Sequence, residues 1–181
     1  VGEGDVIGVM LPSHPDHITL IAALSVLRAI HMPINVQHAF HGLQNQLQHA
    51  APKLLVADAQ YGESVNAVVP TLSFPLPVIW RDKGAPARDE FRLLYARPDS
   101  STSVPDNVDR VAMLTYTSGT TGAPKGALLS GRYLTIGARN AAILAEVAGD
   151  DVLFVWEPFY HLAGWTSVLV ALRAGIPIAM V

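Results

Sequence analysis

The segment TYTSGTTGAPKG, from Thr115 to Gly126, separates two apolar stretches, RVAML before it and ALLS after it. It contains five serine or threonine hydroxyls, three glycines and a single lysine, Lys125. A loop rich in glycine and threonine between two apolar runs is typical of a connection between strands. The sequence therefore predicts a strand–loop–strand unit at this position.

The composition of this loop suits an anionic ligand. Gly119, Gly122 and Gly126 let the backbone bring N–H groups close to a ligand. Hydroxyls and N–H groups favour anionic oxygens, and Lys125 adds a positive charge. The loop therefore predicts a phosphate cradle, with an ordinary polar hairpin loop as the alternative. It is not a Walker loop, because glycine rather than serine or threonine follows the lysine.

Outward from the loop, strand-like and helix-like segments alternate. Before it, the pattern predicts strands at 5–12, 33–36, 53–58 and 76–80, and helices at 13–28, 43–50 and 61–69. Around and after it, the pattern predicts strands at 110–116, 127–129, 151–156 and 176–181, and helices at 132–148 and 162–174, with stops at Gly149 and Gly175. This alternation predicts an α/β fold with parallel sheets and helices on both faces.

Residues 81–107 differ from the rest because they are charged and rich in proline and serine. They predict a surface connection, which divides the chain into a first α/β lobe at 1–105 and a phosphate-loop lobe at 106–181. The chain begins in an apolar run and stops inside a strand-like segment, IPIAMV. We therefore expect a piece of a longer protein, truncated at the C-terminal end of the second lobe.

Composition limits the classes of function. The chain has 181 residues, 50% of them hydrophobic, and a net charge of −3, which suits a globular unit with its own core. There is no basic stripe for nucleic acid, and the absence of cysteine excludes disulfides and thiolate metal sites. The most apolar run, 18–36, contains Arg28, His31 and Pro33, which argues against a membrane span. No signal peptide is visible, so we expect a cytoplasmic protein.

Two histidine pairs have a spacing that suits a metal on a helix, namely His14-x-x-His17 and His38-x-x-His41. Few carboxylates lie near them, so we predict solvated loop histidines rather than a zinc site. We assign no chemistry to three other side chains. Tyr116 is predicted to pack at the edge of the loop, and Arg132 and Arg139 are predicted to be solvated helix positions.

The eleven residues YTSGTTGAPKG, 116–126, resemble without interruption the phosphate-loop signature of the AMP-forming adenylate enzymes. That superfamily contains acyl-CoA synthetases, adenylation domains of peptide synthetases, and luciferases. The segment GDVIGVMLPSHPDHITLIAALSVLRAIHMPINV is also similar to its early strand–helix–strand unit, except that residues 30–32 stand where small residues are common. The resemblance covers essentially the whole chain and implies part of the large N-terminal domain of such an enzyme.

The resemblance implies ATP, Mg²⁺ and coenzyme A as cofactors. A carboxylate would attack the α-phosphorus of ATP, pyrophosphate would leave, and the thiol of coenzyme A would capture the acyl-adenylate. The loop would bind the phosphates through its hydroxyls, backbone and lysine: Thr117, Ser118, Gly119, Thr120, Thr121, Gly122 and Lys125. The hydroxyl of Thr117 would suit a Mg²⁺ contact, because Mg²⁺ prefers oxygen ligands. We expect the loop to be poorly ordered without ligand.

A second segment, EPFYHLAGW at 157–165, follows a predicted strand and opens a predicted helix, where open α/β sheets bind ligands. The residues alone leave open a core aromatic cluster with a hydrogen-bonded histidine. The segment resembles the family's P-x-[FY]-H-x-x-G, which implies that Tyr160, His161 and Gly164 lie at the pocket for the carboxylic acid. Amino-acid-activating members commonly carry aspartate where His161 stands. A neutral imidazole offers no charge to an ammonium group, which favours a fatty, aryl or cyclic carboxylate.

Three parts of the family's machinery match nothing in this chain: the acidic Mg²⁺ segment, the ribose-binding aspartate and the catalytic lysine. No catalytic residue is therefore assigned here, and we expect the chain alone to be catalytically incomplete. We also expect it to self-associate through apolar surface and an open strand edge. Two alternatives stay open, a nucleotide-binding or interaction module without catalysis and a peptide-synthetase-type adenylation domain.

Overall fold

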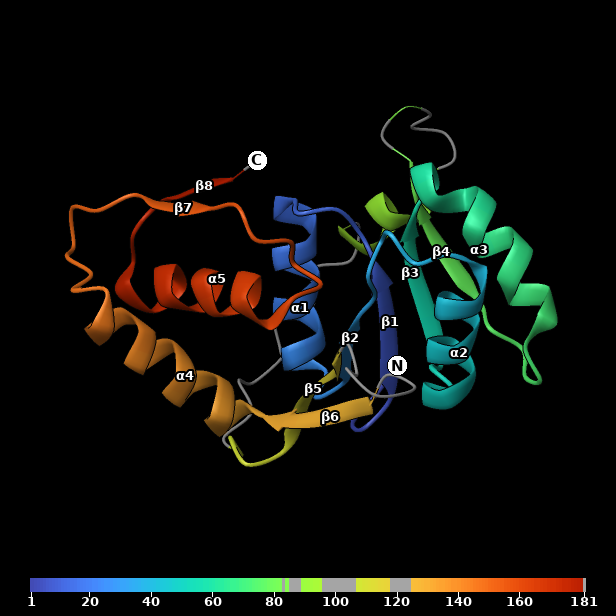
Figure 1. Ribbon diagram of the computed structural model, residues 1–181, viewed down its shortest axis with the longest axis horizontal. Coiled ribbons are helices and arrows are strands. Elements are labelled where there is room, and N and C mark those ends of the chain that lie inside the picture. The colour runs from blue at the N-terminus through green and yellow to red at the C-terminus, as the bar shows by residue number, and fades with distance from the viewer. Residues whose placement is uncertain (83, 85–88, 96–106, 118–124, 181) are drawn as a thin grey trace.

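The computed structural model describes residues 1–82, 84, 89–95, 107–117 and 125–180 (Figure 1). Six strands form one sheet in the order β4-β3-β1-β2-β5-β6. The strands are β1 (Val6–Met10), β2 (Ile30–Pro33), β3 (Leu54–Asp58), β4 (Val78–Arg81), β5 (Val111–Thr117) and β6 (Lys125–Ser130). The first five run parallel, and β6 returns antiparallel to β5. The α/β fold with a mostly parallel sheet is thus confirmed.

Helices cover both faces of this sheet, as the sequence predicted. In Figure 1, α1 (Pro15–Val26) lies on one side of the strands, and α2 (Phe40–Ala50) and α3 (Gly62–Val68) lie on the other. Alternate residues of one strand serve the two layers, because successive side chains of a strand point to opposite faces. Val56 packs in the cluster with α1, whereas Leu55 and Ala57 pack in the cluster with α2 and α3.

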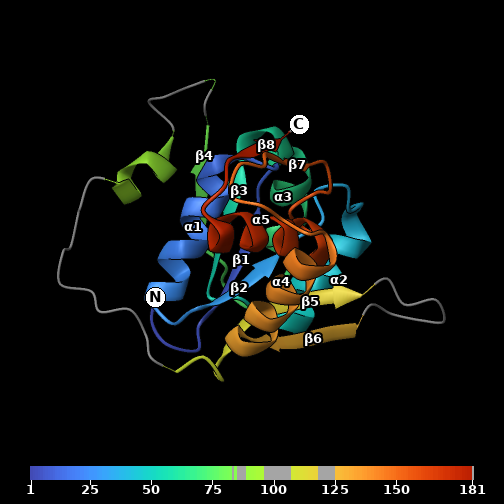
Figure 2. The same ribbon diagram turned by 90° about the vertical axis from the view of Figure 1, so that its left-hand side faces the viewer.

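The C-terminal part of the chain adds a second, smaller layer. Strands β7 (Leu153–Val155) and β8 (Ile178–Met180) form a parallel pair, and α4 (Gly131–Leu144) packs against α5 (Leu162–Ala174). Figure 2 looks onto this side, with α4 and α5 in front of the large sheet. Strands β5 and β6 follow the predicted boundary at residue 105 but belong to the large sheet, so the division into two lobes stays a prediction.

Two helices end earlier than predicted, each at a left-handed residue that is not glycine. Helix α1 ends at Val26, with Arg28 at φ 58°, and α4 ends at Leu144, with Glu146 at φ 51°. At both ends the next two N–H groups bond back to the last turn, as in a Schellman motif. The predicted stop at Gly149 is therefore wrong, whereas α5 stops at Gly175 as predicted, with φ 69°.

Part of the predicted surface connection at 81–107 lies in the core. Arg81 is the last residue of β4 and is buried. A 3-10 helix at Glu90–Tyr95 follows, and its Phe91 packs in the cluster beneath α1. The carboxylate of Glu90 accepts a hydrogen bond from the backbone N–H of Trp80 at 3.1 Å, which attaches this short helix to β4. The prediction of a wholly surface segment was therefore wrong for these residues.

Candidate functional site

A cavity of about 360 Å³ lies at the carboxyl ends of β2 and β5, beside the segment that leads into α5. Its wall is mostly polar and aromatic and is formed by Pro33, Asn35, His38, Gln46, Thr115, Tyr116, Thr117, Tyr160, His161 and Leu162. Ligands of open α/β sheets bind outside the carboxyl ends of the strands. The cavity unites the start of the glycine-rich loop with the aromatic–histidine segment, although more than forty residues separate them in the sequence.

The two ends of the predicted phosphate loop lie side by side. Thr117 ends β5 and lines the cavity, and Lys125 begins β6 directly opposite it in the ladder. The Thr117 hydroxyl donates to the carbonyl of Lys125 at 3.5 Å, and both residues are exposed. The remaining predicted contacts, and the expected disorder of the loop, lie outside the described residues: Ser118, Gly119, Thr120, Thr121 and Gly122.

Tyr160 and His161 form the opposite wall of the cavity, with ring centroids 4.7 Å apart. His161 stands at the N-cap of α5, and its backbone N–H donates to the carbonyl of Pro158 at 3.0 Å. Gly164 lies behind this wall rather than in the cavity lining. A Cβ at Gly164 would lie 2.5 Å from the carbonyl oxygen of Pro158 and 2.8 Å from that of Glu157, so only glycine lets α5 approach this backbone.

Three polar side chains of the cavity come from outside the two predicted segments, namely Asn35, His38 and Gln46. The amide nitrogen of the buried Gln46 donates to the carbonyl of Pro33 at 3.3 Å, and its oxygen has no hydrogen-bond partner among the described residues. Burial lowers the pKa of His38, and the Gln46 side chain opposes that shift. A sequence signal did exist for Gln46, because it shares the apolar face of α2 with Leu43 at helical spacing.

The floor of the cavity comes from β5. Tyr116 packs against the core beneath α2, as predicted, and also lines the cavity. Its hydroxyl lies 2.7 Å from Nδ1 of His49, and burial raises its pKa. Arg132 and Arg139 are exposed on α4, as predicted. Arg132 pairs with Asp109 through Nη2 at 2.9 Å.

The prediction of solvated loop histidines was wrong for the buried His17, and His41 is exposed but lies in α2 rather than in a loop. His17 lies in the first turn of α1, is 1% exposed, and places its Nε2 3.1 Å from Nε2 of the buried His31. Burial lowers the pKa of His17 to about 3, so the ring is neutral. The sequence around His17 gave no sign of its burial, because the rings that cover it, Phe159 and Trp165, come much later in the chain.

The prediction of a solvated loop histidine is correct for His14, which precedes α1 and has a side chain that is 40% exposed. Its Nδ1 accepts the backbone N–H of Asp16 at 3.1 Å and thereby caps α1. Among the residues that the structure describes, no cluster of three or more histidine, aspartate or glutamate side chains could hold a metal ion. Within the same residues, no helix is both long and apolar enough to cross a membrane.

The residues of the segment 157–165 divide between the core and the cavity. Phe159 and Trp165 face inward and join the core with His17, with ring centroids 5.1 to 5.7 Å apart. Tyr160 and His161 face the cavity. The core aromatic cluster that the residues alone left open therefore exists, but its histidine is not His161.

Comparisons with known proteins find relatives of this chain in sequence and in structure. The chain is 29% identical to 4-coumarate–CoA ligase 3 of Oryza sativa subsp. japonica, over 99% of this chain and 33% of that protein. It is 27% identical to a feruloyl-CoA synthase of Amycolatopsis sp., over 90% of this chain and 30% of that protein. The chain therefore spans about a third of the length of these curated relatives.

Solved structures show the same fold. A long-chain-fatty-acid-CoA ligase from Archaeoglobus fulgidus superposes with a TM-score of 0.86 at 24% identity, over 99% of this chain and 36% of that one. The family model described as AMP-binding enzyme matches residues 1–181, which is the whole chain. The chain therefore belongs to the AMP-binding enzyme family.

Proposed function

We propose that the protein containing this chain is an ATP-dependent, AMP-forming acyl-CoA synthetase. The observation that carries the proposal is the single cavity that joins Thr117, at the start of the glycine-rich loop, to Tyr160 and His161. A phosphate-binding loop and an acid-binding wall must meet if a carboxylate is to attack a phosphorus atom. The curated relatives include proteins named feruloyl-CoA synthase, 4-coumarate–CoA ligase and 3-hydroxybenzoate–CoA ligase, and these names support the same reaction.

The proposed chemistry has two steps. A carboxylate oxygen forms a bond to the α-phosphorus of ATP, and the bond to pyrophosphate breaks. The sulfur of coenzyme A then attacks the acyl carbon, and AMP leaves. The loop residues would hold the β- and γ-phosphates, and Lys125 would offset their negative charge. When bound, Mg²⁺ would supply further charge neutralisation, and the exposed hydroxyl oxygen of Thr117 is a ligand of the type that it prefers.

We further propose that the acid is not an amino acid and that aromatic acids are the first class to test. His161, on the cavity wall, offers no negative charge to a substrate ammonium group. The relatives include proteins named for feruloyl, 4-coumarate and benzoate groups. A peptide-synthetase-type activity, by contrast, would require a carboxylate near this position.

The test is carboxylate-dependent exchange of pyrophosphate into ATP by the complete protein, across aromatic, fatty, cyclic and amino acids. We expect exchange with at least one non-amino acid and formation of its CoA thioester. Exchange with amino acids alone would favour the peptide-synthetase alternative. Binding of ATP without exchange for any acid would favour a nucleotide-binding module.

The isolated chain gives a second test. We expect no exchange from residues 1–181 alone, because the acidic Mg²⁺ segment, the ribose-binding aspartate and the catalytic lysine match nothing in them. Robust exchange by the chain alone would contradict this expectation. A cytoplasmic location also stays a prediction, which microscopy of the tagged complete protein would test.

A further inference from the structure

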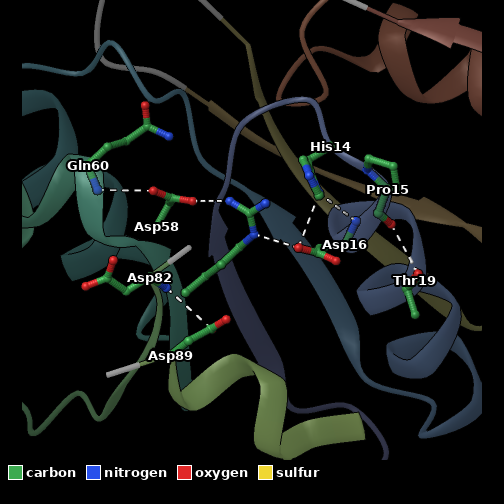
Figure 3. Close-up of polar contacts among 9 residues, drawn as sticks. His14, Pro15, Asp16, Thr19, Asp58, Gln60, Asp82 and Asp89 are labelled. Atoms are coloured by element: carbon green, nitrogen blue, oxygen red, sulfur yellow. Dashed lines mark hydrogen bonds and ion pairs between the residues drawn. The ribbon is translucent and has the colours of Figure 1, made fainter. Parts of the chain in front are cut away.

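A buried charge cluster lies at the carboxyl edge of the sheet, apart from the cavity lining. Arg81, at the end of β4, donates from Nε to Asp16 at 2.7 Å and from Nη1 to Asp58. Asp58 and Asp16 are labelled in Figure 3, where dashed lines mark their contacts with this guanidinium. Burial opposes the charge of Arg81, but the hydrogen bonds to the two carboxylates outweigh it and raise the pKa of the guanidinium.

The two carboxylates attach Arg81 to different parts of the fold. Asp58 ends the neighbouring strand β3 and accepts the N–H of Gln60 at 3.1 Å, so its contact joins β4 to β3. Asp16 lies in the first turn of α1, so its contact joins β4 to the start of a helix. The side chain of Arg81 is 5% exposed, and those of Asp16 and Asp58 are 14% and 10% exposed. Loss of either carboxylate therefore removes a largely desolvated ion pair.

The start of α1 in turn holds the wall of the cavity. Ser13, just before the helix cap, accepts the backbone N–H of Phe159 at 3.3 Å. His17, one residue after Asp16, packs its ring against Phe159 with centroids 5.7 Å apart and against Trp165 at 5.2 Å. Phe159 directly precedes Tyr160 and His161, which line the cavity.

We propose that Arg81 and Asp16 are positioning residues for the acid-binding wall, because their contact fixes the start of α1, and this start fixes Phe159 and hence Tyr160 and His161. The inference rests on the proposed function only for its kinetic consequence. The contacts from Arg81 to Phe159 exist whatever acid the protein binds. Asp58 shares the guanidinium but not the helix, so it provides a matched control.

The kinetic test compares Asp16→Ala with Asp58→Ala in the complete protein. Each variant removes one carboxylate from Arg81, so we expect similar losses in the urea midpoint. Asp16→Ala should raise the KM for the acid about tenfold and leave the KM for ATP within about twofold, because only the acid-binding wall shifts. Asp58→Ala should change neither KM. Asp16→Asn, which restores an acceptor for Nε, should recover most of the loss.

A second readout does not need activity. In a protein with Trp80→Phe and Trp156→Phe, Trp165 is the one remaining tryptophan of this chain and reports on the wall, since it packs against Phe159. Asp16→Ala should make Trp165 more accessible to acrylamide, with a quenching constant about twice that of the parent. Asp58→Ala should leave the constant unchanged.

The two readouts separate the failure of this inference from the failure of the proposed function. If the parent shows no exchange with any acid, the proposed function fails, and the quenching comparison alone decides the positioning role. Equal effects of the two alanine variants on the KM for the acid or on quenching would overturn the inference, because the cluster would then act only on stability. An unchanged KM and quenching constant in Asp16→Ala would overturn it as well.

Discussion

Lys125 is the residue through which phosphate binding can be tested most directly. It begins β6, lies opposite Thr117 and is exposed, so the fold does not depend on its packing. We predict that Lys125→Ala weakens ATP binding by the complete protein about tenfold or more, because a charge-assisted contact to phosphate is lost. Isothermal titration calorimetry measures this change.

The control for Lys125 is Lys53→Ala, which removes another exposed lysine that pairs with Asp5 at 2.7 Å, far from the loop in the sequence. It should leave ATP affinity unchanged. If both variants bind ATP as the parent does, Lys125 has no phosphate contact, and the resemblance of the loop to a phosphate cradle does not extend to its lysine.

Gly164 gives a second prediction at the scale of a single atom. An added Cβ would meet two backbone carbonyl oxygens at 2.5 and 2.8 Å, and backbone cannot move aside as a flexible side chain can. Gly164→Ala should therefore lower the free energy of unfolding by about 2 kcal/mol and displace the segment that carries His161. Urea denaturation measures the loss.

The matched control is Gly137→Ala. Gly137 lies in α4, and an added Cβ there would meet no atom within 4 Å. This substitution should raise the free energy of unfolding by about 0.5 to 1 kcal/mol, because alanine loses less backbone entropy than glycine in a helix. Equal effects of the two substitutions would show that the contact at Gly164 is not tight.

Sequence reasoning reached some residues of the site and not others. The sequence singled out Thr117, Tyr160 and His161 because they stand in contiguous motifs with a recognisable chemistry, and all three line the cavity, while their binding roles stay predictions. The position of Gln46 on the apolar face of α2 indicated burial, but no local pattern showed that Gln46 and His38 reach a cavity, which the pairing of β2 with β5 helps to form. A site built by tertiary contact leaves its local segments looking like ordinary helix and loop.

At the scale of elements, the junction of α1, β2 and α5 predicts a dependence of stability on pH. The folded pKa of His17 is about 3, against an ordinary value of 6.5, and burial also lowers that of His31. Between these values the unfolded chain binds protons that the folded chain does not. Stability should therefore fall as the pH falls from 6.5, by about 1.4 kcal/mol per pH unit for each such histidine.

Urea denaturation at pH 7, 6 and 5 measures this slope above the range where most carboxylates titrate. The double variant His17→Leu/His31→Leu should have a shallower slope than the parent, because it lacks both buried rings. A parent slope equal to that of the double variant would mean that the buried pair does not couple to unfolding.

The elements themselves were largely predictable, and their ends were not. The repeated apolar strands and amphipathic segments gave the right type of element at nearly every position. The ends of α1 and α4 were missed because arginine and glutamate occupy the left-handed positions that glycine usually marks. Arg81 was assigned to a surface connection because a charged residue at the end of a strand does not reveal its two buried partners.

At the scale of the whole molecule, the described surface predicts self-association of the isolated chain. Large apolar side chains of the C-terminal part are more than half exposed, including Leu128, Ile143, Leu144, Phe154, Trp156 and Leu172. Exposed apolar surface favours contacts between molecules. Sedimentation velocity of residues 1–181 should show dimers or larger species at high concentration.

Two substitutions locate the surface that drives this association. Leu144→Lys combined with Trp156→Lys should shift the chain to monomers. The control Leu27→Lys changes an exposed leucine of the N-terminal part and should not shift it. A parent chain that sediments as a monomer at every concentration would contradict the prediction.

The topology was the part of the fold that sequence could not supply. Alternating strands and helices predicted a parallel sheet, but they do not say on which edge each new strand is added. Strand β5 pairs with β2 rather than with β4, the strand that precedes it in the sequence, and β6 then runs antiparallel to β5. Neither choice follows from the alternation of strands and helices along the chain.

The strand order also sets a sequence of events during protein synthesis. Strands β1 to β4 all lie within residues 6–81 and can pair as soon as they leave the ribosome, but the partner of β2 on its other side begins at Val111. At typical translation rates the intervening residues take about 2 to 6 seconds to make. During that interval the edge of β2 is open to any other nascent strand. Codons that slow translation within residues 82–110 should therefore lower the yield of folded protein more than the same codons placed after residue 130.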